Sequence, residues 1–232
     1  MKILLVIPVY NNVETIWDVI KKSRILNPDI LVVNDGSTDG TGNILEYFEK
    51  TLNLLNIPVN KGKGNAIREA SEWARRNGFS HILTIDADGQ HDPDEIDKFL
   101  NAIKSTPDSI IIGCRDFSVH GIPFLSRIGR KLSNTAFRIL TGVKLIDTQS
   151  GFRAYPINTD SKLKCLSNRY DFEMEIILKA ALQKINIKEI SVSVKYTDKT
   201  RQASNFKPLK DTLRIIFLFV RTLPDIIRKG MT

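Results

Sequence analysis

Residues 82–96 read ILTIDADGQHDPDEI, and this stretch decides how the rest of the chain is interpreted. Its apolar run, 82–85, predicts a buried strand. Acidic residues gather where that strand would end: Asp86, Asp88, Asp92, Asp94 and Glu95. The segment from Asp92 and Pro93 onward also suits the first turn of a helix, which favours acids and an N1 proline. The stretch therefore predicts either an acidic loop before a helix or a metal site at a strand end.

Strand-like and helix-like segments alternate along the first half of the chain. Apolar runs rich in β-branched residues occupy 3–9, 30–34, 82–86 and 109–113, with a weaker strand at 52–57. Helix-length segments lie at 13–25, 41–50, 64–77 and 93–104. This alternation predicts an α/β protein with a mostly parallel sheet and helices on both faces. Ligands of such sheets bind beyond the carboxyl ends of the strands, where the polar loops PVYNN, NDGSTDGT and DADGQH fall.

Composition narrows the function classes. The 232 residues carry a formal net charge of +8, with basic residues concentrated in 115–138 and 195–229. Such an excess suits nucleic acid, an anionic membrane or phosphorylated substrates. The two cysteines lack metal-ligand spacing, and no apolar run reaches 18 residues, so we expect neither a zinc site nor a transmembrane span. Because no RNA- or DNA-binding motif is present, we expect no nucleic-acid partner.

The two aspartates after the 82–86 strand have spacing that suits a cation. Side chains at i and i+2 of an extended backbone point to the same side. Asp86 and Asp88 could thus converge on one ion, with Gln90 two residues further on. Oxygen ligands of this kind suit Mg²⁺ or Mn²⁺ that also binds substrate phosphates.

Two other loops are candidates for nucleotide contacts. Asp35 precedes Gly36 in a tight turn, where it could accept hydrogen bonds from a base or ribose. The glycine-rich basic segment NKGKGNA, residues 60–66, suits a loop near a diphosphate. It is neither a P-loop nor a dinucleotide fingerprint, because GxxxxGK[ST] and GxGxxG are absent.

Together these segments resemble the inverting family 2 glycosyltransferases of the GT-A, Rossmann-like fold, most closely the dolichol- and polyprenol-phosphate glycosyltransferases. The matching motifs are IPVYNN, VVNDGSTDGT, NKGKGNAI, TIDADGQHDP, GCRDF and DTQSGFRAY. They cover residues 3–155 in order, and a looser match continues to about 206. The resemblance implies a glycosyltransferase domain over 1–206, followed by an amphipathic, interfacial helical tail over 207–232.

The resemblance also implies roles for individual residues. It assigns catalysis to Asp88, Arg115 and Arg130, and the metal to Asp86, Asp88 and Gln90. It assigns nucleotide-sugar contacts to Pro8, Tyr10, Asn12, Asp35, Lys61 and Asp86, with Lys199, Arg201 and Ser204 on a loop that closes over the donor. We assign the acceptor phosphate to Arg127, Arg130, Ser150 and Arg153. Asn12 stands where the family usually has an acid, a departure that bears on nucleobase preference.

The expected reaction is metal-dependent transfer of a hexose from GDP-mannose or UDP-glucose to a polyprenyl or dolichyl phosphate. The resemblance implies a peripheral enzyme on the cytoplasmic side of a membrane, and it leaves room for a membrane-spanning partner protein. The amphipathic stretch from Phe124 to Leu140 suits that surface, or equally packing against the sheet.

Three other interpretations stay open. A saccharide hydroxyl could be the acceptor, with Asp171 or Glu173 as base, although acids at a helix start are common. A basic protein that binds nucleic acid without catalysis is a second, and it predicts steeply salt-dependent binding. A sugar-nucleotide pyrophosphorylase is a third, but its glycine-rich N-terminal loop is missing.

Overall fold

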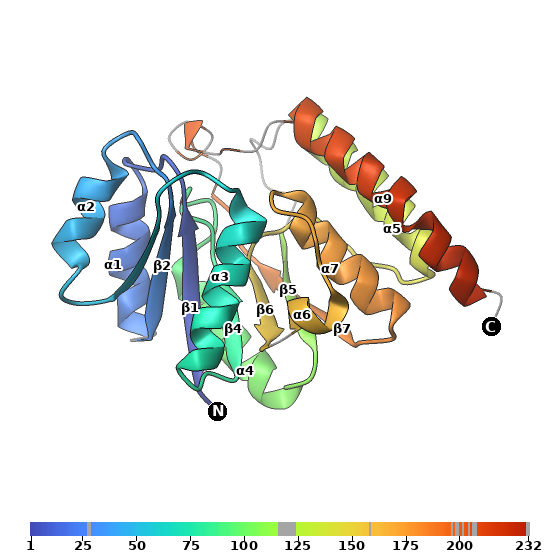
Figure 1. The fold of residues 1–232 in the computed structure, drawn as a ribbon, viewed down its shortest axis with the longest axis horizontal. Helices are drawn as coiled ribbons and strands as arrows, with labels where there is room; N and C mark the ends of the chain where they lie inside the picture. The colour runs from blue at the N-terminus through green and yellow to red at the C-terminus, as the bar shows by residue number, and fades with distance from the viewer. Residues whose placement is uncertain are drawn as a thin grey trace.

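A central sheet covered by helices on both faces forms the body of the molecule (Figure 1). The computed structural model describes residues 1–26, 29–115, 124–157, 159–195, 197, 200, 202, 203, 205 and 208–230.

The sheet has seven strands in the order β3-β2-β1-β4-β6-β5-β7. They are β1 (Ile3–Val9), β2 (Ile30–Asp35), β3 (Asn53–Ile57), β4 (His81–Thr84), β5 (Ile110–Arg115), β6 (Arg153–Pro156) and β7 (Ile187–Val192). Strand β6 runs antiparallel to both its neighbours, β4 and β5, and all other pairings are parallel. The carboxyl ends of β1, β2 and β4 therefore meet at one edge of the sheet.

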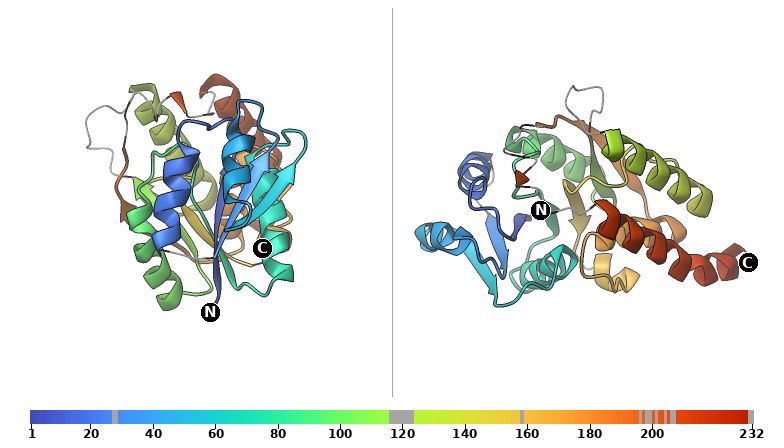
Figure 2. Two further views of the ribbon diagram at one scale, coloured as in Figure 1. Left: turned by 90° about the vertical axis from the view of Figure 1, so that its left-hand side faces the viewer. Right: turned by 90° about the horizontal axis from the view of Figure 1, so that it is seen from above.

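Alternation along β1 shows how the two faces are covered. Leu4 and Val6 point into a core with helices α3 (Lys63–Arg76), α5 (Phe124–Thr141), α6 (Thr159–Leu163), α7 (Asp171–Leu182) and α9 (Pro208–Gly230). Leu5 and Ile7 point into a second core with α1 (Ile16–Leu26), α2 (Thr41–Phe48) and α4 (Ile96–Ser105). Side chains of period two on a strand thus produce a three-layer arrangement, which Figure 2 shows from the side and from above.

The predicted α/β class and mostly parallel sheet are confirmed. Strand β6 was missed, because its four residues RAYP lie in a polar segment with no strand-length apolar run. The helix predicted from 93 begins with a 3-10 turn, η1 (Pro93–Glu95), which the Asp92 carboxylate caps by accepting the Asp94 N–H.

Helices α5 and α9 lie together at the periphery of the molecule. Helix α9 packs beside α7 and α5 and runs along one edge, and the chain ends beyond its far end (Figures 1 and 2). Among the residues that the structure describes, no helix combines the length and apolar character that crossing a membrane requires.

Candidate active site

Loops from three strand ends form one connected surface. The loop after β1 contacts the loop after β2, where the Asn11 N–H donates to Ser37 Oγ at 3.1 Å and the Thr38 N–H donates to Asn11 Oδ1 at 2.7 Å. It also contacts the loop after β4, since the Thr15 hydroxyl donates to the Ala87 carbonyl at 2.6 Å. The predicted convergence of the three polar loops is therefore present.

Asp86 and Asp88 follow the end of β4, and their carboxyl groups interact electrostatically. Burial and the neighbouring Asp86 carboxylate raise the pKa of Asp88 to about 7. Its Oδ1 accepts the Gln90 N–H at 3.0 Å. Burial lowers the pKa of His91, next in the chain, to about 4, so this ring is neutral at pH 7. A neutral histidine leaves the charge of the two aspartates uncompensated on that side.

Lys63, which the sequence analysis did not single out, provides a positive charge beside Asp86. Its Nζ forms an ion pair with Asp86 and a second with Glu173 Oε1 at 2.9 Å. Burial opposes the charge on Lys63, but the two carboxylates raise its pKa above the ordinary value. Burial likewise opposes ionisation of Asp86, and the Lys63 ammonium lowers the pKa of that carboxyl. Glu173 thus belongs to this charged cluster as well as to the first turn of α7.

The glycines of NKGKGNA serve close packing in this arrangement. A Cβ added at Gly62, which has a φ of +101°, would lie 2.5 Å from the Asn168 carbonyl oxygen. One added at Gly64 would lie 2.5 Å from Phe172 Cβ. These approaches draw the start of α3 against the segment before α7 and bring Lys63 to Glu173. The predicted proximity of this loop to a diphosphate stays a prediction.

Asp35 holds the same loop from the other side. It is 3% exposed, and its carboxylate accepts the Lys61 N–H at 2.9 Å and the Gly62 N–H at 2.7 Å. The Lys61 side chain is exposed. Asp35 therefore shapes the loop before α3, and an ionised carboxylate retains capacity to accept further bonds.

Arg115, at the end of β5, is engaged by a residue that sequence reasoning missed. Its Nε donates to Asp147 Oδ2 at 2.6 Å and its Nη2 to Asp147 Oδ1 at 2.9 Å. Asp147 has no exposed surface, and Arg115 and hydrogen bonds lower its pKa despite burial. The Arg130 guanidinium donates to the neighbouring Ile146 carbonyl at 3.1 Å. The two arginines assigned to catalysis thus meet at the same short segment.

Arg153 and Ser150 do not lie where an acceptor could contact them. Both are 0% exposed. The Arg153 guanidinium donates to three backbone carbonyls, those of Ser150, Thr148 and Glu173. In this structure Arg153 therefore anchors the DTQSG segment and the start of α7 from within, and a direct phosphate contact is not available to it. Arg127, by contrast, is exposed on α5.

The segment after β7 folds back over the first loop. The Asn12 side-chain amide donates to the Ala203 carbonyl at 2.7 Å, and the Asn205 amide donates to the Tyr10 carbonyl at 2.6 Å. Gln90 Nε2 reaches the Thr200 carbonyl at 3.4 Å. Lys199, Arg201 and Ser204 lie outside the described residues. Pro8 is buried within β1.

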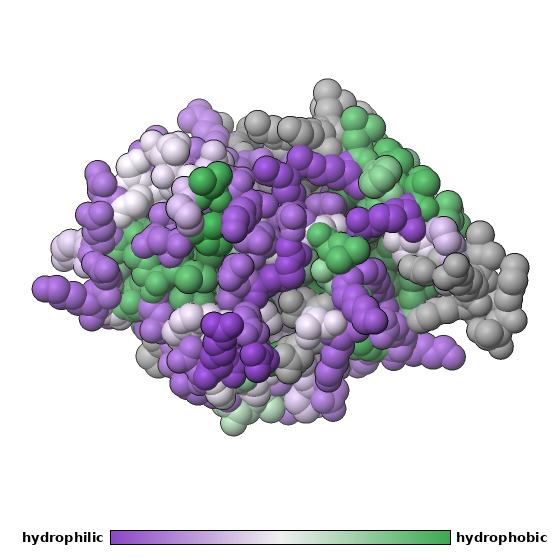
Figure 3. All heavy atoms as spheres, viewed as in Figure 1, coloured by the Kyte–Doolittle hydropathy of each residue, from purple (hydrophilic) through white to green (hydrophobic). Residues whose placement is uncertain are grey.

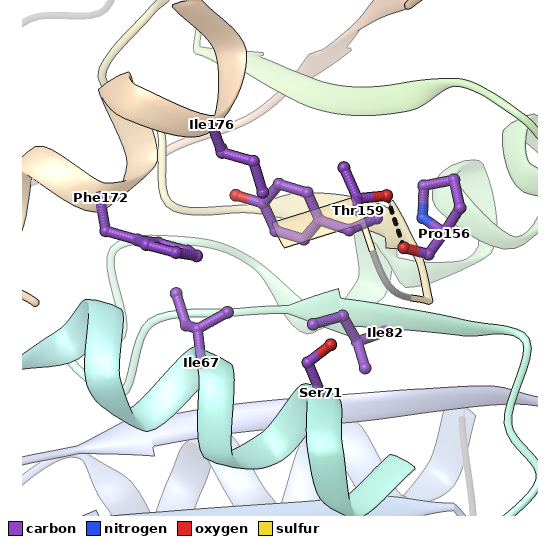
Figure 4. A pocket seen from close by; sticks show the side chains of 8 residues that line it. Ile67, Ser71, Ile82, Pro156, Thr159, Phe172 and Ile176 are labelled. Carbon is purple, nitrogen blue, oxygen red and sulfur yellow. Dashed lines mark hydrogen bonds between the residues drawn. The ribbon is translucent and has the colours of Figure 1, made fainter. Parts of the chain in front are cut away.

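A small cavity lies on the α3 and α7 side of the sheet (Figure 4). Its lining is mainly apolar and comes from α3, β4, β6, α6 and α7: Ile67, Ser71, Ile82, Tyr155, Pro156, Thr159, Phe172 and Ile176. No charged side chain lines it, so it does not suit a diphosphate.

Comparison with known proteins agrees with this arrangement. The family model described as Glycosyl transferase family 2 matches residues 4–161. A polyprenol monophosphomannose synthase of Mycolicibacterium smegmatis is 29% identical over 202 residues, covering 82% of this chain and 76% of that protein. A UDP-N-acetylglucosamine–dolichyl-phosphate N-acetylglucosaminyltransferase of Methanococcus voltae is 30% identical over 220 residues, covering 84% and 86%.

A solved structure shares the fold. Glucosyl-3-phosphoglycerate synthase from Mycobacterium tuberculosis, in complex with Mn²⁺, UDP-glucose and phosphoglyceric acid, superposes with a TM-score of 0.70 at 17% identity. The match covers 95% of this chain and 79% of that one. With a family match over more than half its length and a GT-A fold, the chain belongs to glycosyltransferase family 2 and is a glycosyltransferase.

Proposed function

We propose that this enzyme transfers a hexose, with inversion, from a nucleoside diphosphate sugar to a polyprenyl or dolichyl phosphate at a membrane surface. The observation that carries the proposal is the pair Asp86 and Asp88 at the end of β4, beside Lys63 and among three polar strand-end loops. Relatives named for transfer of sugars to polyprenol and dolichyl phosphates support the acceptor class.

The donor set at Asp86 and Asp88 fits a divalent cation. Two carboxylates of one strand end supply hard oxygen ligands. The pKa of Asp88 is raised by burial and by the negative charge of Asp86, which a cation would offset. Asp86, Asp88 and Gln90 would hold Mg²⁺ or Mn²⁺. When bound, the ion would stabilise the negative charge of the leaving diphosphate.

The chain's own residues have separate tasks in this reaction. Tyr10 and Asn12 belong to the loop that Asn205 and Ala203 contact, and that loop would hold the nucleoside. Asp35 fixes the loop before α3 beside it. The leaving diphosphate would meet Lys63, because that ammonium is already buried against Asp86. Preorganised charge of this kind stabilises a transition state without reorganisation.

The acceptor phosphate would bind on the side of β5 and α5. Arg115 and Arg130 both contact the 146–147 segment, and Arg127 lies on the exposed face of α5. Arginine binds phosphate through a planar fork of donors. Since a lipid monophosphate is already anionic, positioning its oxygen suffices and no strong general base is needed.

A saccharide hydroxyl acceptor is the second candidate, because the Glu173 carboxylate lies in the charged cluster and not only at a helix start. A hydroxyl needs a base, which Glu173 could supply once Lys63 moved away. Asp171 fits that task less well, since its carboxylate accepts the Arg169 N–H at the start of α7.

The exposed face of α9 suits a membrane surface. Apolar side chains project outward along it, and Figure 3 shows them gathered over this helix: Leu213, Ile216, Phe217, Val220 and Leu223. The opposite side, with Ile215 and Leu218, packs in the core. Helix α5 adds exposed Ile128, Leu132 and Ile139 near its basic residues. Apolar area beside basic charge binds anionic bilayers, which supports a peripheral enzyme of the cytoplasmic leaflet, alone or with a membrane-spanning partner.

The test is a transfer assay with purified protein, Mn²⁺, a panel of GDP- and UDP-sugars and a short-chain polyprenyl phosphate. We expect labelled sugar on the lipid phosphate from one donor, and none with Asp88→Ala. Donor binding without transfer to the lipid, but with transfer to a saccharide, would move the acceptor to the second candidate.

A further inference from the structure

We propose that Lys63 is an internal counter-cation, which neutralises Asp86 while the divalent cation is absent and so makes metal binding depend on the donor diphosphate. The proposal rests on the proposed function, because it assumes that Asp86 and Asp88 bind a divalent cation.

The first support is the position of the ammonium group. Lys63 Nζ contacts a carboxylate oxygen of Asp86 and lies 2.9 Å from Glu173 Oε1. Only 10% of the Lys63 side chain and 7% of the Glu173 side chain are exposed. A charge removed from water to this extent requires partners. The ammonium therefore cannot leave Asp86 for solvent without loss of stabilisation.

The second support is the backbone around the pair. A Cβ added at Gly151 would lie 2.5 Å from Lys63 Nζ and would also clash with Asp86 Oδ2. The segment carrying Gly151 is fixed at this position, since its carbonyl accepts the Thr84 hydroxyl at 2.9 Å. The absence of a side chain at Gly151 therefore leaves room for the ammonium beside Asp86, and a larger residue at this position would displace it.

The third support is the charge balance. The carboxylates of Asp86, Asp88 and Glu173 carry −3 when ionised and Lys63 carries +1, which leaves −2. A divalent cation would offset this charge, but it would then face the Lys63 ammonium across the same carboxylate. Like charges at such range repel strongly in a poorly solvated site. The repulsion is relieved only when a further anion enters, and the donor diphosphate is such an anion.

Two consequences follow for binding without any chemical step. The protein alone should bind Mn²⁺ weakly, and a nucleoside diphosphate should strengthen that binding. By linkage, Mn²⁺ should strengthen nucleotide binding by the same factor. Removal of the ammonium should improve donor-free metal binding and reduce this mutual effect.

The experiment is a Mn²⁺ titration of the full chain, followed by the electron paramagnetic resonance signal of free Mn²⁺, with and without GDP or UDP. We expect Lys63→Met to bind Mn²⁺ about tenfold more tightly than wild type without nucleotide, and the nucleotide effect to shrink by about the same factor. Lys63→Arg retains the charge and should stay within about threefold of wild type.

A matched control removes a lysine that is remote from the site. Lys188 lies near the amino end of the edge strand β7, where its ammonium donates to Ser105 Oγ at 3.3 Å. Lys188→Met changes net charge equally, and we expect less than about a twofold effect on Mn²⁺ affinity. The double variant Lys63→Met with Glu173→Gln removes the Lys63–Glu173 pair together, so that Glu173 is not left as a buried carboxylate without a partner. It should also bind Mn²⁺ more tightly than wild type.

Unchanged or weaker donor-free Mn²⁺ binding in both the single and the double variant would overturn the proposal. This outcome is separable from failure of the proposed function. If wild type transfers sugar to polyprenyl phosphate while the variants leave Mn²⁺ affinity unchanged, only the role of Lys63 is rejected. If the variants tighten Mn²⁺ but no polyprenyl phosphate is glycosylated, Lys63 keeps its role and the acceptor assignment fails.

Discussion

The strand-end site and the outer face of α9 are built on opposite principles. At the site, charged side chains are buried and held by one another, as in the pairs of Lys63 with Asp86 and Glu173. On α9, apolar side chains are exposed, and Phe217 is 68% exposed. Burying unpaired charge and exposing large apolar groups are both unfavourable in water. Under the proposed function, the paired charges of the first region would bind ions and phosphates, and the exposed apolar side chains of the second would meet a lipid surface.

The two regions are connected through α7. Glu175 on this helix has no exposed side-chain surface and pairs with Arg221 of α9 at 3.1 Å and with Lys179 at 2.8 Å. The same carboxylate accepts the N–H groups of Leu166 and Ser167, just before the segment that packs on Gly62. Under the proposed function, chemistry and surface binding would reside on separate elements that the buried Glu175 connects, so we expect that each can be altered alone.

The largest expected effect is on chemistry. Asp88→Ala removes a metal ligand and should lower sugar transfer by about a thousandfold or more, or ~4 kcal/mol of transition-state stabilisation. Its binding to anionic vesicles should stay at the wild-type level, because α9 is untouched. A radiolabel transfer assay and vesicle co-sedimentation measure the two properties. Equal loss of both would show that the regions are not separable.

We expect the next largest effect from loss of the Glu175 ion pairs that connect the two regions. Glu175→Gln keeps the side-chain shape but leaves Arg221 and Lys179 without their carboxylate, which we expect to cost about 2 kcal/mol of unfolding free energy. Urea denaturation followed by circular dichroism measures it. The matched control is Glu72→Gln, whose carboxylate pairs with Arg75 and Arg76 on the exposed side of α3. Loss of that exposed pair should cost far less than loss of the buried one, and equal costs would contradict a buried link.

A pH effect should distinguish the charged region from the apolar one. Burial and the neighbouring Asp86 raise the pKa of Asp88 from the ordinary range of an aspartate to about 7. The folded state thus binds this proton more tightly than the unfolded chain, and the resulting stability is complete below about pH 4 and is lost as pH rises through 7. The asparagine side chain introduced by Asp88→Asn does not ionise in this pH range, so it contributes no such pH dependence.

In metal-free buffer, Asp88→Asn should therefore gain about 2 kcal/mol of unfolding free energy relative to wild type between pH 5.5 and pH 8. Thermal or urea unfolding at the two pH values measures the difference. A difference that is constant with pH would show that Asp88 has an ordinary pKa.

The smallest expected effect concerns the α9 face. Phe217→Glu should weaken binding to anionic vesicles by about tenfold, from lost apolar burial and added negative charge. Transfer to a water-soluble short-chain acceptor should not change. Ile25→Glu is the control, since Ile25 is 81% exposed on α1, away from α9. Equal effects of the two changes would reject α9 as the binding surface.

Local sequence patterns predicted much of the fold and part of the site. Apolar runs that alternate with helix-length segments predicted the mostly parallel sheet, and the polar strand ends predicted the converging loops and the position of Asp86 and Asp88. Pairings between distant segments were not predictable in this way. The cluster of Lys63, Asp86 and Glu173 unites three segments, and its only local signal is a lysine flanked by glycines.

The predictions and the structure differ mainly at charged residues whose partners lie inside the protein. Arg153 was assigned to the acceptor phosphate, yet the fold directs its guanidinium to backbone carbonyls. Asp147, the partner of Arg115, lies 32 residues away in sequence. A single sequence shows which residues carry charge, but the choice between a ligand and an internal partner depends on packing.

The most direct test of the account presents three acceptors side by side in anionic vesicles or buffer, with the preferred donor and Mn²⁺. They are a long-chain polyprenyl phosphate, the matching polyprenol without phosphate, and a soluble saccharide. We predict transfer to the polyprenyl phosphate alone, because the proposed reaction requires both the charge of the acceptor phosphate and the lipid surface. Transfer to the saccharide or to the uncharged polyprenol at a comparable rate would contradict it.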